Sequence, residues 1–239
     1  MELETRAREL AENLALVRED MAGAAQRAGR DPSDVVLVAV SKTYPAADVA
    51  ALFAAGQRVF GESYVQEAVA KRAELAALPL EWHFIGGLQR NKAKFVAGDF
   101  ALVHGVDSLK LAETLARKAM EKGAAQDVLL QVNLGREEQK GGVLEEDLPG
   151  LAEAVTGMEG LTLSGLMLLP PFFDDPERAR PFFARARELK EDLERRLGRS
   201  LPHLSMGMTG DFQAAVEEGA TLVRVGTRIF GSRPRKAGV

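Results

Sequence analysis

The most informative segment of this chain reads Val35-Val36-Leu37-Val38-Ala39-Val40-Ser41-Lys42-Thr43-Tyr44-Pro45. Its first six residues are all apolar, and four of them are valine. A continuous β-branched run without alternation is typical of a strand that is covered on both faces, as in a parallel sheet. Tyr44-Pro45 ends the run, because the residue before a proline is pushed out of the helical region and proline has no N–H for a ladder. The segment therefore predicts a first strand with Lys42 at its carboxyl end.

Lys42 is a candidate nucleophile because of this position. The carboxyl ends of the strands are where α/β proteins carry out their chemistry. An ammonium group at the mouth of an apolar sheet loses solvation, which favours the neutral amine, and that form attacks aldehydes. The alternative is a lysine that leaves the sheet and extends its head to water, which position alone favours. The remainder of the chain has to decide between the two.

Composition excludes several classes of function. The formal net charge of −4 argues against general affinity for nucleic acid. The absence of cysteine excludes disulfides, thiolate metal sites and a cysteine nucleophile. The N-terminus is charged where a signal peptide is apolar, and no apolar run reaches the about 18 residues of a membrane span. We therefore expect a soluble, cytoplasmic protein without a nucleic-acid or membrane partner.

Strand-like and helix-like segments alternate along the whole chain. Seven further strands are expected at 59–60, 82–87, 101–104, 128–133, 161–169, 203–206 and 221–225. Strands that alternate with helices indicate a parallel sheet, and eight of them close naturally into a barrel. We predict an α/β protein, a (β/α)8 TIM barrel that forms a single domain over residues 1–239 with an N-terminal helix. A doubly wound open sheet is the competitor, but Ser41-Lys42-Thr43-Tyr44 offers no glycine-rich dinucleotide fingerprint.

Some local predictions are specific. The first helix should end near Gly29, a suitable residue for the left-handed position after a helix. Ser63 should cap a helix, residues 89–97 should be helical, and a further helix should run over 145–155. Pro181 should lie in the first turn of the helix after the sixth strand. The buried face of that helix should contain Phe182, Ala186, Leu189, Leu193 and Leu197.

Two glycine-containing segments follow the last two predicted strands. Ser205-Met206-Gly207-Met208-Thr209 follows strand seven, and Arg224-Val225-Gly226-Thr227 closes strand eight. Barrels often bind phosphate with the loops after these strands, where glycines let backbone N–H groups approach an anion and hydroxyls add donors. Barrel closure brings these loops beside Lys42. An amine next to a phosphate site suits a phosphorylated aldehyde, of which pyridoxal 5′-phosphate (PLP) is the common one.

Segments throughout the chain resemble the PLP homeostasis protein family, the YggS/PROSC family. They are residues 39–43, 60–67, 82–86, 89–92, 165–167, 204–208 and 223–231. The resemblance implies a fold type III PLP barrel, similar to the N-terminal domain of alanine racemase but without that enzyme's second domain. It also implies a protein that binds PLP and keeps the reactive aldehyde in check, with no robust catalytic activity assigned to it.

Matching motifs imply the site. Lys42 would form the internal aldimine, and Arg224 would lie beside the cofactor, on its phosphate or ring-nitrogen side. Near the ring nitrogen, a guanidinium that keeps its proton would leave the pyridine neutral and weaken the electron sink. The residues that would hold the phosphate are Ser205, Gly207, Met208, Gly226 and Thr227.

Three positions depart from the family pattern. Ser63 stands where the family commonly has asparagine, Gly87 replaces a frequent proline, and Thr209 replaces a frequent serine with its hydroxyl kept. The first departure puts a side-chain hydrogen bond at the second strand in doubt, and the second should loosen the third loop. None of them affects Lys42.

Other polar residues have structural interpretations beside functional ones. His83 and His104 are more readily hydrogen-bonded core residues than catalytic groups. Lys92 and Lys140 could reach the phosphate, although a solvated position is the simpler interpretation. We expect no metal, since the three histidines have no ligand spacing.

Three functions remain open. The first is a monomeric, non-catalytic protein that buffers PLP or delivers it to PLP-dependent apo-enzymes. The second is a PLP-dependent racemase or decarboxylase, but racemases of this fold need a second acid/base, typically a tyrosine. The chain has only Tyr44 and Tyr64, and Tyr44 is too close to Lys42 in sequence to oppose it easily. The third is an aldolase-type barrel in which Lys42 forms a Schiff base with a sugar phosphate.

Overall fold

Eight parallel strands form a closed barrel in chain order, which confirms the predicted fold. The computed structural model describes residues 2–137 and 139–232, so the segment 233–239, expected to be a solvated tail, lies outside the described residues. The strands are β1 (Val36–Val40), β2 (Val59–Glu62), β3 (Glu81–Phe84), β4 (Leu102–Val106), β5 (Gln126–Val132), β6 (Leu161–Leu168), β7 (His203–Met208) and β8 (Leu222–Val225).

Strand register brings the two ends of the sequence together. Ala39 of β1 pairs with Phe60 of β2 on one side and with Val225 of β8 on the other. The chain that leaves β1 at Lys42 therefore lies between the loops that follow β2 and β8. Closure of the barrel thus brings Lys42 and Gly226 to the same end of neighbouring strands, as the sequence predicted.

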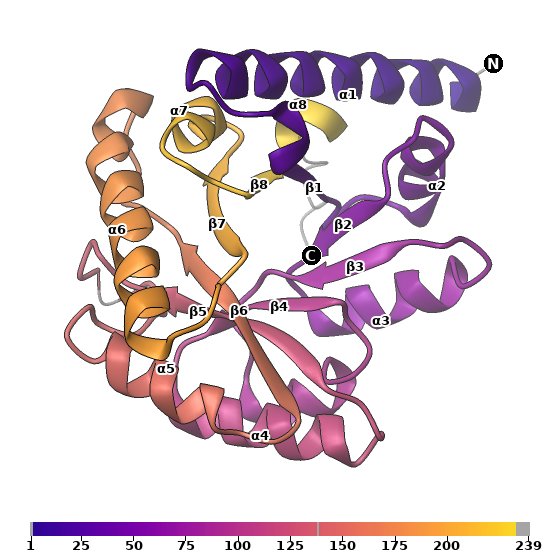
Figure 1. Cartoon of the computed structure of the whole chain (residues 1–239). Helices are drawn as coiled ribbons and strands as arrows, with labels where there is room; N and C mark the ends of the chain where they lie inside the picture. The colour runs from indigo at the N-terminus through magenta and orange to yellow at the C-terminus, as the bar shows by residue number, and fades with distance from the viewer. Residues whose placement is uncertain (1, 138, 233–239) are drawn as a thin grey trace.

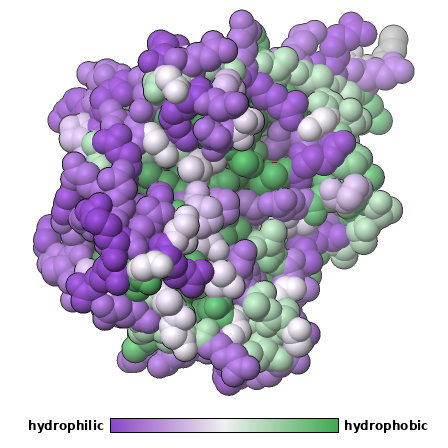
Figure 2. Space-filling view, in the orientation of Figure 1, coloured by the Kyte–Doolittle hydropathy of each residue, from purple (hydrophilic) through white to green (hydrophobic). Residues whose placement is uncertain are grey.

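Helices surround the barrel as a ring (Figure 1). They are α1 (Glu2–Arg27), α2 (Ala46–Ala54), α3 (Val65–Glu74), α4 (Leu109–Met120), α5 (Leu148–Thr156), α6 (Arg180–Leu197), α7 (Phe212–Glu217) and α8 (Thr227–Phe230), with short 3-10 helices η1 (Pro32–Asp34), η2 (Arg90–Phe95) and η3 (Pro176–Ala179). In the space-filling view, much of the surface is hydrophilic, and hydrophobic residues show in the central recess and also along the right and lower edges (Figure 2).

Helix α1 lies across α2, α7 and α8 and holds α8 in place. The guanidinium of Arg6 donates to the carbonyl oxygen of Phe230 at 2.8 Å, and the side-chain amide of Asn13 donates to that of Ile229 at 3.0 Å. The same arginine pairs with Asp48 of α2 at 2.7 Å. The N-terminal helix therefore fixes the segment that directly follows Gly226.

Two local predictions for the chain between β2 and β4 are wrong. Ser63 does not cap α3. Its backbone lies directly against Gly86, and the cap position falls to Tyr64, which makes no side-chain cap hydrogen bond. The segment expected to be a helix over 89–97 is the short 3-10 helix η2, in which only Ala93 is buried, too little apolar surface to hold a longer helix.

Helix α5 begins later than predicted, at Leu148. The buried face of α6 contains Ala186, Leu189 and Leu193 as predicted. Phe183 rather than Phe182 is fully buried in α6. Phe182 instead packs on Phe173 with a ring-centroid distance of 5.8 Å. Pro181 lies in the first turn of α6 as predicted. Gly29 follows α1 with φ of 67°, the left-handed conformation expected of it.

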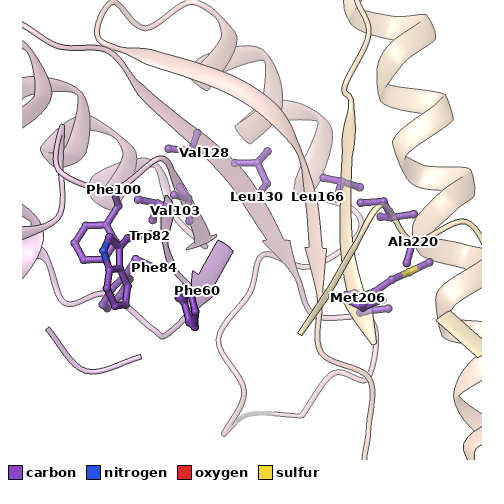
Figure 3. Packing of buried hydrophobic residues seen from close by; sticks show 14 of the residues in the cluster. Phe60, Trp82, Phe84, Phe100, Val103, Val128, Leu130, Leu166, Met206 and Ala220 are labelled. Carbon is purple, nitrogen blue, oxygen red and sulfur yellow. The ribbon is translucent and has the colours of Figure 1, made fainter. Parts of the chain in front are cut away.

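Two hydrophobic layers hold the fold together. The outer layer lies between strands and helices, and Figure 3 shows part of it, with Phe60, Trp82, Phe84 and Phe100 gathered on one side. Ring centroids there are 5.8 Å apart for Phe60 and Trp82. The inner layer lies inside the barrel and consists of Val38, Leu102, Leu129, Met167 and Leu222. The barrel is thus a packed core with a floor beneath its mouth.

Candidate functional site

A cavity of about 790 Å³ opens at the carboxyl ends of the strands. All eight strands or the loops that follow them contribute to its wall. One lining residue from each, in chain order, is Lys42, Ser63, Gly86, Asp107, Gln131, Leu169, Thr209 and Gly226. Such a cavity at the carboxyl face is the usual position of a binding site in this architecture.

Lys42 lines this cavity and is half-buried. It follows the alternation of β1, in which the Val38 side chain belongs to the barrel interior and Val40 to the cavity wall. The structure therefore places Lys42 where the sequence predicted.

A buried ion cluster holds the turn that carries Lys42. The ammonium of Lys71 donates to the carbonyl oxygen of Ser41 and to Oε1 of Glu62, each at 2.6 Å. The hydroxyl of Ser41 donates to the same Glu62 oxygen at 2.7 Å. Burial raises the pKa of Glu62, while Lys71 acts in the opposite direction. Within the described residues, Oε2 of Glu62 has no hydrogen-bond partner, so the negative charge of Glu62 depends on Lys71.

Thr43 is strained beside this cluster. It has φ of 72°, which is uncommon for a β-branched residue. Its N–H donates to Oε1 of Glu67 at 2.5 Å, and Glu67 also pairs with Lys71 at 2.6 Å. Strained backbone of this kind persists only where surrounding contacts determine it. Lys71 and its two carboxylates thus fix both sides of Lys42.

Thr209 connects the loops after β7 and β8. Its hydroxyl oxygen accepts from the N–H of Gly226 at 3.2 Å and lies 3.4 Å from the hydroxyl of Thr227. All three residues line the cavity, together with Met208 and Gly210. Hydroxyls and glycine backbone at one wall provide donors for an anion. From the sequence, Thr209 was noted only as a threonine that replaces a frequent serine and keeps its hydroxyl. The sequence did not show that this residue joins the two loops.

Neither Ser205 nor Gly207 is among the residues that line the cavity, and their predicted phosphate roles stay predictions. Ser205 is fully buried below its floor, where its Oγ accepts from Nη1 of Arg224 at 2.5 Å and contacts Nδ1 of His104 at 2.9 Å. Gly207 has φ of 86°, and a Cβ there would lie 2.5 Å from that of Ala215. Ser205 instead supports Arg224, and Gly207 allows β7 to pack on α7.

Arg224 reaches the cavity from inside the barrel. It is 4% exposed, and its Nη2 donates to the carbonyl oxygen of Leu168 at 2.9 Å. Burial lowers the pKa of Arg224 to about 10, and Asp211 opposes that effect. The guanidinium therefore remains a cation at neutral pH and presents only donors.

His83 and His104 are buried below the cavity, as the structural interpretation predicted. Nε2 of His104 lies 3.0 Å from Nδ1 of His83, and the Nε2 of His83 lies 2.9 Å from Oε1 of Glu81. Burial, followed by the charges of His83 and Arg224, holds the pKa of His104 well below 6.5. His104 is therefore neutral at physiological pH.

The remaining candidates divide between wall and exterior. Lys140 lines the cavity, and its ammonium donates to the carbonyl oxygen of Pro170 at 2.7 Å and pairs with Glu137 at 2.5 Å. Lys92 lies on η2, away from the lining. Tyr44 turns to α8, where its hydroxyl donates to the carbonyl oxygen of Gly231 at 2.6 Å.

No group of three or more histidine or acidic side chains in the described part of the chain is arranged to hold a metal ion. No helix among residues 2–137 and 139–232 is long and apolar enough to cross a membrane.

Residues 10–234 match the family described as alanine racemase, N-terminal domain. A pyridoxal phosphate homeostasis protein of Pseudomonas aeruginosa is 51% identical over 224 residues, which are 94% of this chain and 96% of that protein. Its namesake from Aquifex aeolicus is 44% identical over 222 residues, covering 93% and 97%.

Two solved structures are also similar to this chain. PipY of Synechococcus elongatus, determined with PLP bound, is 41% identical with a TM-score of 0.83, and the match covers 93% of this chain and 100% of that one. Alanine racemase of Corynebacterium glutamicum has a TM-score of 0.72 at 17% identity, over 98% of this chain and 64% of that one. The second likeness shows the shared fold alone.

Proposed function

The chain belongs to the pyridoxal phosphate homeostasis protein family, built on the alanine racemase N-terminal domain fold, and we propose that it binds PLP at Lys42. The single observation that carries the proposal is the joint presence of Lys42, Arg224 and the Thr209–Gly226–Thr227 wall in one cavity. When bound, PLP supplies an aldehyde that condenses with a lysine amine.

The chain's own groups fit the three parts of such a ligand. Lys42 is the amine toward the aldehyde. Thr209 and Thr227 offer hydroxyls, and Gly226 lacks the side chain that would separate a phosphate from the backbone. Arg224 is a buried donor from the barrel side, which suits a pyridine nitrogen that accepts a hydrogen bond. Met208 completes the same wall.

We propose that the protein holds PLP without catalysis, buffering it and delivering it to PLP-dependent apo-enzymes as a cytoplasmic monomer. Arg224 supports the absence of catalysis, since a guanidinium that keeps its proton leaves the pyridine ring a weak electron sink. Tyr44 is bonded to Gly231, so it is not placed as the second acid/base of a racemase.

A PLP-dependent racemase is the second candidate, because Tyr64 lines the cavity and is 55% exposed. A tyrosine there could face a ligand on Lys42. Incubation of the PLP-loaded protein with L- and D-amino acids distinguishes the candidates. Turnover that Tyr64→Phe abolishes would favour the racemase, whereas no turnover favours the holding protein.

The binding proposal is tested by adding PLP to the purified protein and recording absorbance. An absorbance band at about 420 nm should appear, and Lys42→Ala should abolish it. Lys92→Ala is the matched control, since Lys92 lies outside the cavity wall. Borohydride reduction and peptide mapping should then place the label on Lys42. A label on another lysine, or a band that survives Lys42→Ala, would refute the assignment.

A further inference from the structure

A row of hydrogen-bonded side chains runs through the inside of the barrel, from the cavity to the opposite end. It begins at Arg224 of β8, which lines the cavity. The next contacts are Arg224 to Ser205 at 2.5 Å and Ser205 to His104 at 2.9 Å. The row continues from His104 to His83 at 3.0 Å and from His83 to Glu81 at 2.9 Å. Glu81 is the first residue of β3, and its side chain is 52% exposed.

The chemistry of the two ends fixes the direction of every bond between them. A guanidinium only donates, and a carboxylate only accepts. If both histidines are neutral, one pattern satisfies the row: Ser205 donates to Nδ1 of His104, Nε2–H of His104 donates to Nδ1 of His83, and Nε2–H of His83 donates to Glu81. All the donors then point from the cavity toward the exposed end, and both histidines are Nε2–H tautomers.

Protonation of His83 reverses the middle of the row. A second proton on Nδ1 of His83 makes that atom a donor, so Nε2 of His104 has to accept and the proton of His104 moves to Nδ1. The Nδ1–H of His104 then faces Ser205, whose oxygen receives two donors, one of them from Arg224. The hydrogen bond that orients Arg224 is weakened by this competition.

We propose that Ser205, His104 and His83 are positioning residues for Arg224, and that they couple protonation at the exposed end of the barrel to the cavity. The functional part of this inference rests on the proposed PLP site. Neither histidine is among the residues that line the cavity, so both act through Arg224.

The surrounding charges agree with the neutral pattern. The hydrogen bond from His83 lowers the pKa of Glu81, which keeps the accepting carboxylate ionised. His203 of β7 also faces His83, and burial lowers the pKa of His203 while Asp127 and Glu81 act in the opposite direction. On the cavity side, Asp211 faces Arg224. Protonation therefore enters the row from the end where Glu81, Asp127 and His203 meet.

The test reads the histidine tautomers by ¹⁵N NMR in the protein without PLP. The chain has only three histidines, so single-histidine variants assign the signals. At neutral pH, His83 and His104 should both be Nε2–H tautomers. Glu81→Lys supplies a donor where the carboxylate accepted, so it should convert both to Nδ1–H. Glu81→Gln keeps an accepting oxygen and is the matched control that should leave them unchanged.

A second measurement does not depend on any variant. As the wild-type protein is titrated with acid, His104 should change from Nε2–H to Nδ1–H when His83 takes up its proton. An Nδ1–H tautomer of His104 at neutral pH, or a His104 signal that neither Glu81→Lys nor acid changes, would overturn the coupling.

The same pair of variants reports on the cavity. Glu81→Lys should weaken PLP binding by roughly tenfold relative to Glu81→Gln, since the bond of a charged donor is partly lost. Equal affinities of the two variants would refute the effect on Arg224. Because the tautomers are read without PLP, a wild-type protein that fails to bind PLP would refute only the proposed function. A tautomer pattern that stays fixed beside normal PLP binding would refute only the coupling.

Discussion

The ammonium of Lys71 lies 2.6 Å from the carbonyl oxygen of Ser41, the residue before Lys42. Both residues are buried, and Lys71 also neutralises Glu62. A helix residue thus holds the strand end that carries the proposed PLP lysine, from the side that faces away from the cavity. Because Lys71 holds the backbone before Lys42, the position of Lys42 and its reaction with PLP can be tested with separate variants.

Lys71→Met should destabilise the protein by about 3–5 kcal/mol, because it leaves Glu62 as a buried charge without its counter-ion. Urea unfolding measures the change. Lys71→Met combined with Glu62→Gln removes the orphaned charge and should recover part of the loss. If the double variant is no more stable than Lys71→Met alone, the pair does not act as a buried ion pair.

Gly207→Ala should destabilise the protein by about 1–3 kcal/mol, because the added methyl group would overpack the buried contact between β7 and α7. The added Cβ would lie 2.5 Å from that of Ala215, at a backbone φ of 86°. Gly150→Ala is the control, because no atom lies within 4 Å of a Cβ there. Thermal unfolding of both variants measures the difference, and equal Tm values would contradict the packing role.

Thr209→Val should weaken PLP binding by about fivefold, because it removes a hydrogen bond of about 1 kcal/mol at the wall shared by the loops after β7 and β8. Thr209→Ser keeps the hydroxyl and should bind as the wild type does. Titration of PLP by absorbance gives both constants. A valine variant with wild-type affinity would exclude Thr209 from the phosphate wall.

The barrel was predictable because its signals are local. Apolar β-branched segments such as residues 35–40 define strands wherever they occur, and their number determines closure. Lys42, Gly226 and Thr227 were predictable for the same reason, since a residue at a strand end must face the mouth. That the whole chain acts as one domain and a monomer stays a prediction.

The details that the sequence did not reveal depend on tertiary packing. The pairing of β7 with β8 shifts register between Ser205 and Met208, and this shift decides that Ser205 turns to Arg224 while Thr209 reaches the cavity. No spacing in the sequence reveals it. The role of Lys71 was equally hidden, because it depends on the rotation of α3 against the end of β1.

Acid should destabilise the protein through His104. The pKa of His104 is well below 6.5 in the folded state, so the unfolded chain takes up a proton that the folded one refuses. The contribution of His104 to the free energy of unfolding is fully present at pH values above 6.5, the pKa of the unfolded state. It falls as the pH drops below that value, by up to about 1.4 kcal/mol per pH unit. Unfolding free energies measured from pH 7.5 downward should show this slope, and His104→Gln should reduce it. Burial also lowers the pKa of His203, so His203→Gln should reduce the slope as well. A slope that His104→Gln leaves unchanged would contradict the assignment to His104.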